Sequence, residues 1–147
     1  MPEGVSGECA LGFDFGMRRI GVASGNRITA SAQPLAVLAA KDGEPDWNRI
    51  AALIAEWKPE ALVVGLPLSL DGDEQAITRA ARAFAGKLGR RSGLPVHLVD
   101  ERHTSQEAAR RFAGQRASGS ARRRDAANID SLAAVVILET WLRETPE

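Results

Sequence analysis

Three of the 19 acidic residues stand in apolar surroundings, where a freely solvated charge is not expected. Asp14 lies inside the segment CALGFDF, Glu101 follows the segment VHLVD, and Asp130 opens the segment DSLAAVVIL. An isolated ionised carboxylate is costly to remove from water, and a divalent cation bound by several carboxylates offsets that cost. Mg²⁺ and Mn²⁺ prefer oxygen ligands, and two such ions about 3.5–4 Å apart activate water and stabilise the leaving oxygen of a phosphodiester. These three acids are therefore candidate metal ligands and catalytic residues.

Each acid also has a local structural explanation, which the sequence leaves open. Asp14 could accept backbone hydrogen bonds from the turn at 16–18. Glu101 could pair with Arg102 or Arg18, and Asp130 could favour a helix N-terminus through its charge alone. The occurrence of all three beside a strongly basic region favours the metal interpretation.

The predicted elements would bring these acids to one edge of a sheet. Apolar runs and their flanking residues predict strands at 9–15, 18–24, 28–38, 61–66 and 96–99. Spacing and capping residues predict helices at 46–57, about 74–88, 104–112 and 129–142, with a mobile loop at 114–128. The carboxyl ends of parallel strands and the N-termini of helices gather on one edge of an α/β sheet. The pattern predicts an α/β domain with a central mixed five-stranded sheet flanked by helices.

Length and composition favour one globular domain. The chain has 147 residues, of which 44% are hydrophobic and 26% charged, and we expect a flexible leader at 1–8 and one domain at 9–147. No apolar run reaches the ~18 residues that span a bilayer, and the N-terminus lacks the pattern of a secretory signal. The lone cysteine, Cys9, excludes an internal disulfide and fits a reducing cytoplasm. P-loop, dinucleotide and Gly-x-Ser-x-Gly motifs are missing from the sequence.

The charge is balanced in total but unevenly distributed. Residues 79–124 hold 12 of the 19 Lys and Arg residues and 3 of the 19 Asp and Glu residues. Arginine accounts for 16 of the basic residues, and its guanidinium fits phosphate better than a lysine ammonium does. Solvated helix faces explain single arginines, whereas the cluster as a whole indicates a nucleic-acid partner.

The motifs taken together resemble the YqgF/RuvX family. The resemblance rests on their order along the chain, namely FDFG at 13–16, RIGVA at 19–23, VVGLP at 63–67 with Asp71-Gly72, DER at 100–102 and IDS at 129–131. It covers about residues 9–142. It implies an RNase H-like fold related to the RuvC resolvases, cytoplasmic nuclease activity in the 5′-end processing of pre-16S rRNA, and junction resolvase activity for some members.

The resemblance also assigns roles to individual residues. Asp14 matches the acid of the first strand, Glu101 the acid of the Asp-Glu-Arg motif, and Asp130 the acid at the start of the last helix, so all three would hold Mg²⁺ or Mn²⁺. A fourth acid of the RuvC type has no convincing match, and Asn128 stands where the family often has lysine. Phosphate contacts are expected from Arg18, Arg102, Arg110, Arg111, Arg116, Arg122, Arg123 and Arg124.

Three functional hypotheses remain at this point. The leading one is a metal-dependent endonuclease, with pre-rRNA favoured over branched DNA and a monomer over a dimer. A Holliday-junction resolvase would instead need a symmetric dimer. The second hypothesis is an RNA-binding ribosome-assembly factor with little catalysis. The third is an actin-like ATPase, which a single domain of this length disfavours.

Overall fold

The computed structural model describes residues 9–68, 71, 73–101 and 125–144, the last segment with side chains from Ser131 onward. Its centre is a six-stranded mixed sheet in the order β4-β3-β2-β1-β5-β6. The strands are β1 (Cys9–Asp14), β2 (Arg19–Asn26), β3 (Ser31–Lys41), β4 (Glu44–Pro45), β5 (Ala61–Leu66) and β6 (Val96–Asp100). The first four pair antiparallel, and β5 is parallel to both β1 and β6.

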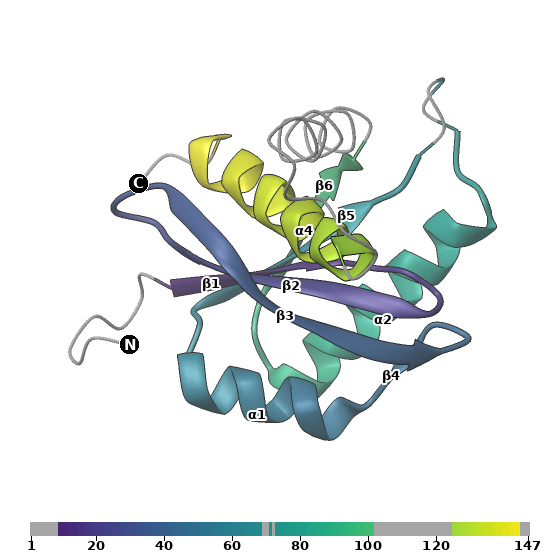
Figure 1. Ribbon diagram of the computed structural model, residues 1–147, viewed down its shortest axis with the longest axis horizontal. Coiled ribbons are helices and arrows are strands. Elements are labelled where there is room, and N and C mark those ends of the chain that lie inside the picture. The colour runs from purple at the N-terminus through teal and green to yellow at the C-terminus, as the bar shows by residue number, and fades with distance from the viewer. Residues whose placement is uncertain (1–8, 69–70, 72, 102–124, 145–147) are drawn as a thin grey trace.

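The helices form one layer on each side of the sheet. They are α1 (Trp47–Trp57), α2 (Ala76–Ser92) and α4 (Asp125–Glu144). In Figure 1, α1 and α2 lie below the sheet and α4 lies above it. The predicted mixed α/β architecture is confirmed, with six strands rather than five. The additional strand, β4, has two residues and pairs with the end of β3 through a tight turn at Asp42-Gly43, both with positive φ. Asp-Gly is a typical hairpin turn, but the sequence prediction assigned no strand to this segment.

Alternate residues of the central strands point to opposite layers. Leu11 and Phe13 of β1 belong to the core under α1 and α2. Ala10 of the same strand belongs to the core under α4, and a Cβ on Gly12 would meet Leu138 of α4. Ala10, Gly12 and Asp14 alternate along β1 with the residues that face α1 and α2. Because side chains alternate between the two faces of a strand, Asp14 is directed to the α4 side.

The packing of α4 fixes its direction across the sheet. A Cβ on Gly12 would lie 2.8 Å from Leu138 Cβ and 3.2 Å from the Ala134 carbonyl oxygen. A Cβ on Gly25, which pairs with Ala10, would lie 2.8 Å from Leu138 Cδ2 and 3.0 Å from Leu142 Cδ1. The helix therefore runs from the carboxyl end of β1 towards its amino end, and its first turns lie at the carboxyl end.

The helix boundaries agree with prediction to different degrees. Asp46 caps α1 as expected, accepting a hydrogen bond from Asn48 N at 3.0 Å, and α1 ends at Trp57. Helix α2 continues to Ser92, beyond the predicted end near Leu88, and stops at Gly93 in the left-handed conformation (φ 71°). Helix α4 begins at Asp125 and not at 129, so residues 125–128 were wrongly assigned to the loop. The predicted leader at 1–8, the helix at 104–112 and the loop at 114–124 lie outside the described residues.

No helix in the described part of the chain is long and apolar enough to cross a membrane.

Candidate active site

Asp14 is the last residue of β1 and is half-buried. The parallel register places Phe13 opposite Val64 of β5, so Asp14 lies at the level of Gly65. The strand then turns back into β2 through a tight loop in which a Cβ on Gly16 would meet the Arg19 carbonyl oxygen at 2.5 Å. The apolar segment thus delivers one carboxylate to the carboxyl edge of the sheet.

Glu101 reaches the same edge from the other side of β5. It follows Asp100, which pairs with Leu66, and it is 6% exposed. Its carboxyl group and that of Asp14 are hydrogen-bonded to each other. Two of the three acids singled out in the sequence therefore meet in the structure.

The electrostatic environment of Glu101 disfavours its charge. Burial raises the pKa of the Glu101 carboxyl, and the neighbouring Asp100 charge raises it further, while the hydrogen bond with Asp14 acts in the opposite direction. A buried carboxyl group whose pKa is raised, in contact with a second carboxyl group, is typical of a site that binds a cation.

Gly65 lies on the strand between the two acids and makes their contact sterically feasible. A Cβ at this position would lie 2.7 Å from Glu101 Cγ and 2.4 Å from Ile137 Cδ1 of α4. Any larger side chain would displace either the carboxylate or the helix. The glycine of the VVGLP motif is therefore part of the site.

Asp130 is in α4, one turn before Ala134, and its side chain is outside the described set. Ala134 lies against Gly12, and the first turns of α4 lie at the carboxyl end of β1. The backbone of Asp130 is thus at the end of the sheet where Asp14 and Glu101 meet. Within the described residues, no group of three or more His, Cys, Asp or Glu side chains is placed to hold a metal ion.

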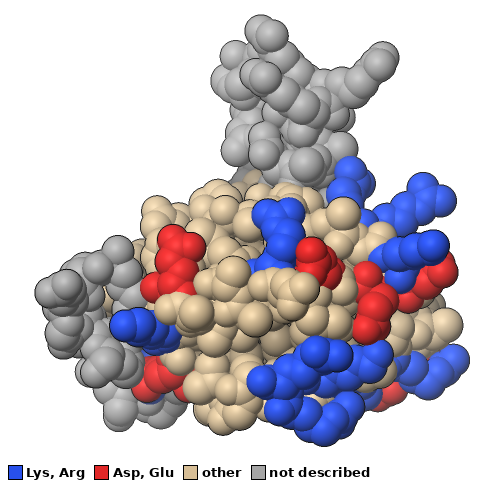
Figure 2. Space-filling view, turned by 90° about the horizontal axis from the view of Figure 1, so that it is seen from below, with Lys and Arg blue, Asp and Glu red and all other residues tan. Residues whose placement is uncertain are grey.

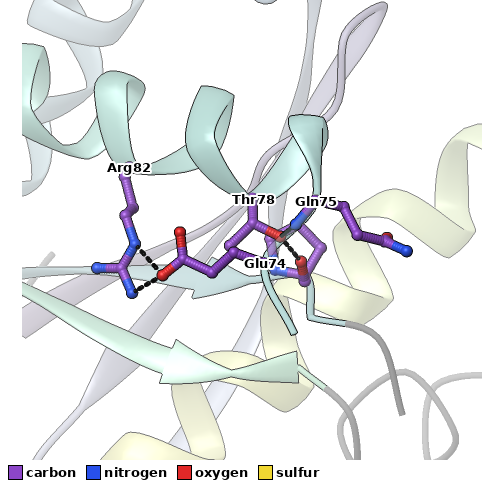
Figure 3. A network of polar contacts seen from close by, with 5 residues as sticks. Glu74, Gln75, Thr78 and Arg82 are labelled. Carbon is purple, nitrogen blue, oxygen red and sulfur yellow. Dashed lines mark hydrogen bonds and ion pairs between the residues drawn. The ribbon is translucent and has the colours of Figure 1, made fainter. Parts of the chain in front are cut away.

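The loop that follows β5 is tied to α2 beside this edge (Figure 3). Thr78, fully buried, donates a hydrogen bond to the Pro67 carbonyl oxygen and accepts one from Gln75 N at 3.0 Å. Arg82 donates to one oxygen of Glu74 from Nε at 2.9 Å and from Nη2 at 2.6 Å. One hydroxyl thus fastens both ends of the loop at 67–75. Thr78 is the N3 residue of α2, and its hydroxyl accepts from the backbone of the N-cap residue Gln75. The sequence carried no signal for this role, because Gln-x-x-Thr differs from the usual capping pattern of Ser/Thr-x-x-Glu/Gln.

Of the arginines predicted to bind phosphate, only Arg18 is among the residues that the structure describes. Arg18 is exposed in the turn after β1, at the same edge as Asp14. Arg102, Arg110, Arg111, Arg116, Arg122, Arg123 and Arg124 lie outside the described residues.

The mixed sheet with acids at its carboxyl edge defines an RNase H-like nuclease fold of the RuvC type. The solved structure "T. thermophilus RuvC in complex with Holliday junction substrate" has a TM-score of 0.55 at 18% identity, covering 92% of this chain and 95% of that one. A second, "Thermus thermophilus RuvC structure", has a TM-score of 0.52 at the same identity and coverage.

The chain belongs to the RuvX family, whose model carries the description Holliday junction resolvase and matches residues 8–144. The relatives bear the name "Putative pre-16S rRNA nuclease". One from Legionella pneumophila is 51% identical over 99% of both chains. One from Klebsiella pneumoniae is 50% identical over 92% of this chain and 96% of its own, and one from Coxiella burnetii is 53% identical over 92% of each. The family resemblance seen in the sequence is confirmed.

Proposed function

We propose that this protein is a metal-dependent endonuclease that hydrolyses phosphodiester bonds at the 5′ end of pre-16S rRNA. The observation that carries the proposal is the hydrogen-bonded carboxyl pair of Asp14 and Glu101 at the carboxyl edge of the sheet. The names of the relatives supply the substrate class. This activity would place the protein in the cytoplasm, with the ribosome precursors.

The chemistry of the donor set fits Mg²⁺ or Mn²⁺. Hard cations of this kind prefer carboxylate oxygens and tolerate water in the remaining positions. Asp14 and Glu101 would hold the metal together with Asp130 from the first half of α4. When bound, the ion supplies water activation and neutralises charge on the leaving oxygen.

The protein's own groups prepare this chemistry in three ways. Asp14 and Glu101 would hold the cation from the ends of β1 and β6, and Glu101, at 6% exposed, would present its carboxylate from largely buried surroundings. Arg18, exposed in the adjacent turn, would donate hydrogen bonds to a non-bridging phosphate oxygen. The remaining predicted arginines, from 102 to 124, would bind flanking phosphates.

A second candidate is cleavage of a Holliday junction, which the description of the family favours. That reaction needs two sites held by a self-complementary dimer face. Helix α2 does not offer an apolar face of this kind, because Phe84 and Leu88 are buried in the core of their own subunit and Ile77 packs against it. We therefore favour a monomer acting on RNA.

The decisive experiment compares Asp14→Asn with Asp42→Asn, which removes one exposed carboxylate in a left-handed turn that asparagine also adopts. Cleavage of a pre-16S 5′-leader fragment and of a four-way DNA junction is measured with Mn²⁺, with molecular mass in solution. Asp14→Asn should lower RNA cleavage by more than about 100-fold, because even outer-shell changes at metal sites cost 10–100-fold, and Asp42→Asn should match wild type.

The other outcomes separate the alternatives. Wild-type cleavage by Asp14→Asn at saturating Mn²⁺ would remove that residue from the site. RNA binding without cleavage by the wild-type protein would indicate an assembly factor. Paired symmetric cuts on the junction by a stable dimer, with no action on the RNA, would establish the resolvase.

A further inference from the structure

We infer that the outer face of α2 is a second RNA-binding surface, which holds the phosphate backbone of the substrate beyond the segment being cut. The α2 basic face consists of Arg79, Arg82, Lys87, Arg90 and Arg91. This inference takes from the proposed function only the identity of the RNA that would bind. The surface itself is argued from the charge, spacing and exposure of the helix.

The charge composition of α2 is one-sided. Five of its 17 residues are basic, and the helix contains no acidic residue. Cations three or four positions apart, such as Arg79 and Arg82 or Lys87 and Arg91, repel each other on a helix surface. If the charges of α2 served only solubility, acidic residues among the basic ones would make the helix more stable. Binding of a polyanionic partner explains why α2 carries basic residues alone.

All five side chains of the α2 basic face are exposed. Figure 2 looks onto the side of the molecule that carries α1 and α2, and blue side chains gather over its lower and right-hand parts. Arg82 and Lys87 make surface ion pairs with Glu74 and Glu44, at 2.6 Å and 3.0 Å. Exposed pairs of this kind contribute little and are readily exchanged for another anion.

Small residues separate the cations along this side of α2, and this shape suits a nucleic-acid backbone. Ala83 and Gly86 lie between Arg79 and Arg90 on the same side of the helix, and the Arg90 guanidinium extends back over Gly86, where a Cβ would lie 3.3 Å from Arg90 Nη1. Arg79 and Arg90 are separated by about 16 Å along the helix axis at 1.5 Å per residue. The Arg91 guanidinium is held 4.7 Å from the centre of the Trp47 ring, which fixes the far end of the stripe.

The path of α2 connects this surface to the candidate active site. The helix begins directly after the loop that leaves the carboxyl end of β5, so Arg79 lies at the site end and Arg90 at the opposite end. Asp14 is directed to the α4 side of the sheet and α2 covers the opposite side (Figure 1), so RNA leaving the Asp14–Glu101 edge would bend around the carboxyl end of β5 before it continues along α2.

An acidic protein partner is less well matched. Stable protein interfaces are centred on large apolar or aromatic anchors. The exposed large hydrophobic residues in the described part of the chain are Met17, Ile28 and Leu98, and none of them is on α2. Arginine forks without a central apolar anchor favour phosphates.

The test is the double variant Arg79→Gln/Arg90→Gln beside the control Lys58→Asn/Arg143→Gln. The control removes two exposed cations at the C-terminal ends of α1 and α4, away from the carboxyl edge of the sheet, and asparagine suits the left-handed conformation of residue 58. Binding of a long pre-16S leader fragment, and of a short one limited to the cleaved segment, is followed in EDTA over a salt series. Loss of two phosphate contacts should flatten the plot of log K against log salt for the long RNA by about 1.4–1.8 units. Binding of the short RNA and the behaviour of the control should be unchanged.

Each outcome either supports or overturns the inference that α2 binds RNA. An α2 variant that binds the long RNA with the affinity and salt slope of the control overturns the inference. A variant that keeps RNA binding but loses binding of polyglutamate also overturns it, and assigns the face to an acidic protein. If the wild-type protein binds RNA through α2 but does not cleave it, the proposed catalytic function fails and this inference stands.

Discussion

The side chain of Glu101 fills the space that a Cβ atom on Gly65 would need: the two would be only 2.7 Å apart. On the other side of β5, Asp14 ends its strand at the same level. The carboxyl pair therefore depends on a glycine in the strand between its two members. This relationship accounts for the glycine in an otherwise apolar strand.

The first prediction follows from this contact. Gly65→Ala should disturb the carboxyl pair and the packing of Ile137 together, because its Cβ would lie 2.4 Å from Ile137 Cδ1. Overpacking of this kind costs about 1–3 kcal/mol, and we expect Mn²⁺ affinity and cleavage to fall with stability. Thermal melts and Mn²⁺ titration measure both effects.

The matched control is Gly89→Ala in α2, whose Cβ would make an ordinary contact of 3.4 Å with Val96 Cγ2. This change should stabilise the helix by roughly 0.5–1 kcal/mol. A Gly65→Ala protein with wild-type Mn²⁺ affinity would contradict the steric argument.

The second prediction concerns Glu101 and pH. Its pKa is raised in the fold, by burial first and by Asp100 second. The folded state therefore binds the proton more tightly than the unfolded state does, and wild-type stability falls as pH rises from the ordinary glutamate value of about 4.3. In EDTA, Glu101→Gln should melt higher than wild type at pH 7 and no higher at pH 4.

Saturating Mn²⁺ should raise the melting temperature of the wild-type protein, because a ligand that binds only the folded state stabilises it. The Glu101→Gln variant should gain less. A difference between the two proteins that stays constant from pH 4 to pH 7 would show that the Glu101 charge is not the cause.

The third prediction concerns the loop after β5. Thr78→Val removes the donor to Pro67 and the acceptor for Gln75 N while keeping the side-chain shape. Leaving buried polar groups unpaired costs about 1–3 kcal/mol. We expect faster proteolysis at 67–75 and a lower melting temperature, and Thr78→Ser, which keeps the hydroxyl, should restore most of both. Equal behaviour of Thr78→Val and Thr78→Ser would mean that the hydroxyl does not hold the loop.

The fourth prediction concerns the arginine run. Replacing Arg122, Arg123 and Arg124 by alanine should weaken binding to RNA of any sequence, because phosphate contacts carry no base information. The salt slope should become shallower by about 0.7–0.9 log units for each lost contact. An unchanged slope would identify the run as solvated surface.

Local patterns were enough to predict most elements. The bounds of β5, the Asp46 cap and the end of α1 at Trp57 all follow from residues close in sequence. Strand β3 extends three residues beyond the predicted end at 38, and its pairing with β2 shifts register between Val22 and Ala23, beside Pro34. The start of α4 at Asp125 was missed because its first turn carries no apolar periodicity.

The candidate site was harder to predict, because it depends on the order of the strands. Asp14 and Glu101 are 87 positions apart in the chain, and only the placement of β5 between β1 and β6 brings them together. The sequence did point to both residues, since each carboxylate ends an apolar segment. Thr78 was not singled out, because its role comes from what lies next to it in space. The cations of α2 were included in the basic region at 79–124, but the sequence did not show that they share one exposed face.

The close seating of α4 on Gly12 and Gly25 has a mechanical consequence. Leu138 sits above both glycines, and the neighbouring positions on β1 and β2 carry side chains. The helix therefore cannot slide along its axis without first lifting off the sheet. Were a cation held between Asp14 and Glu101, α4 would keep its position on the sheet, and the side-chain torsions of the two acids would make the adjustment.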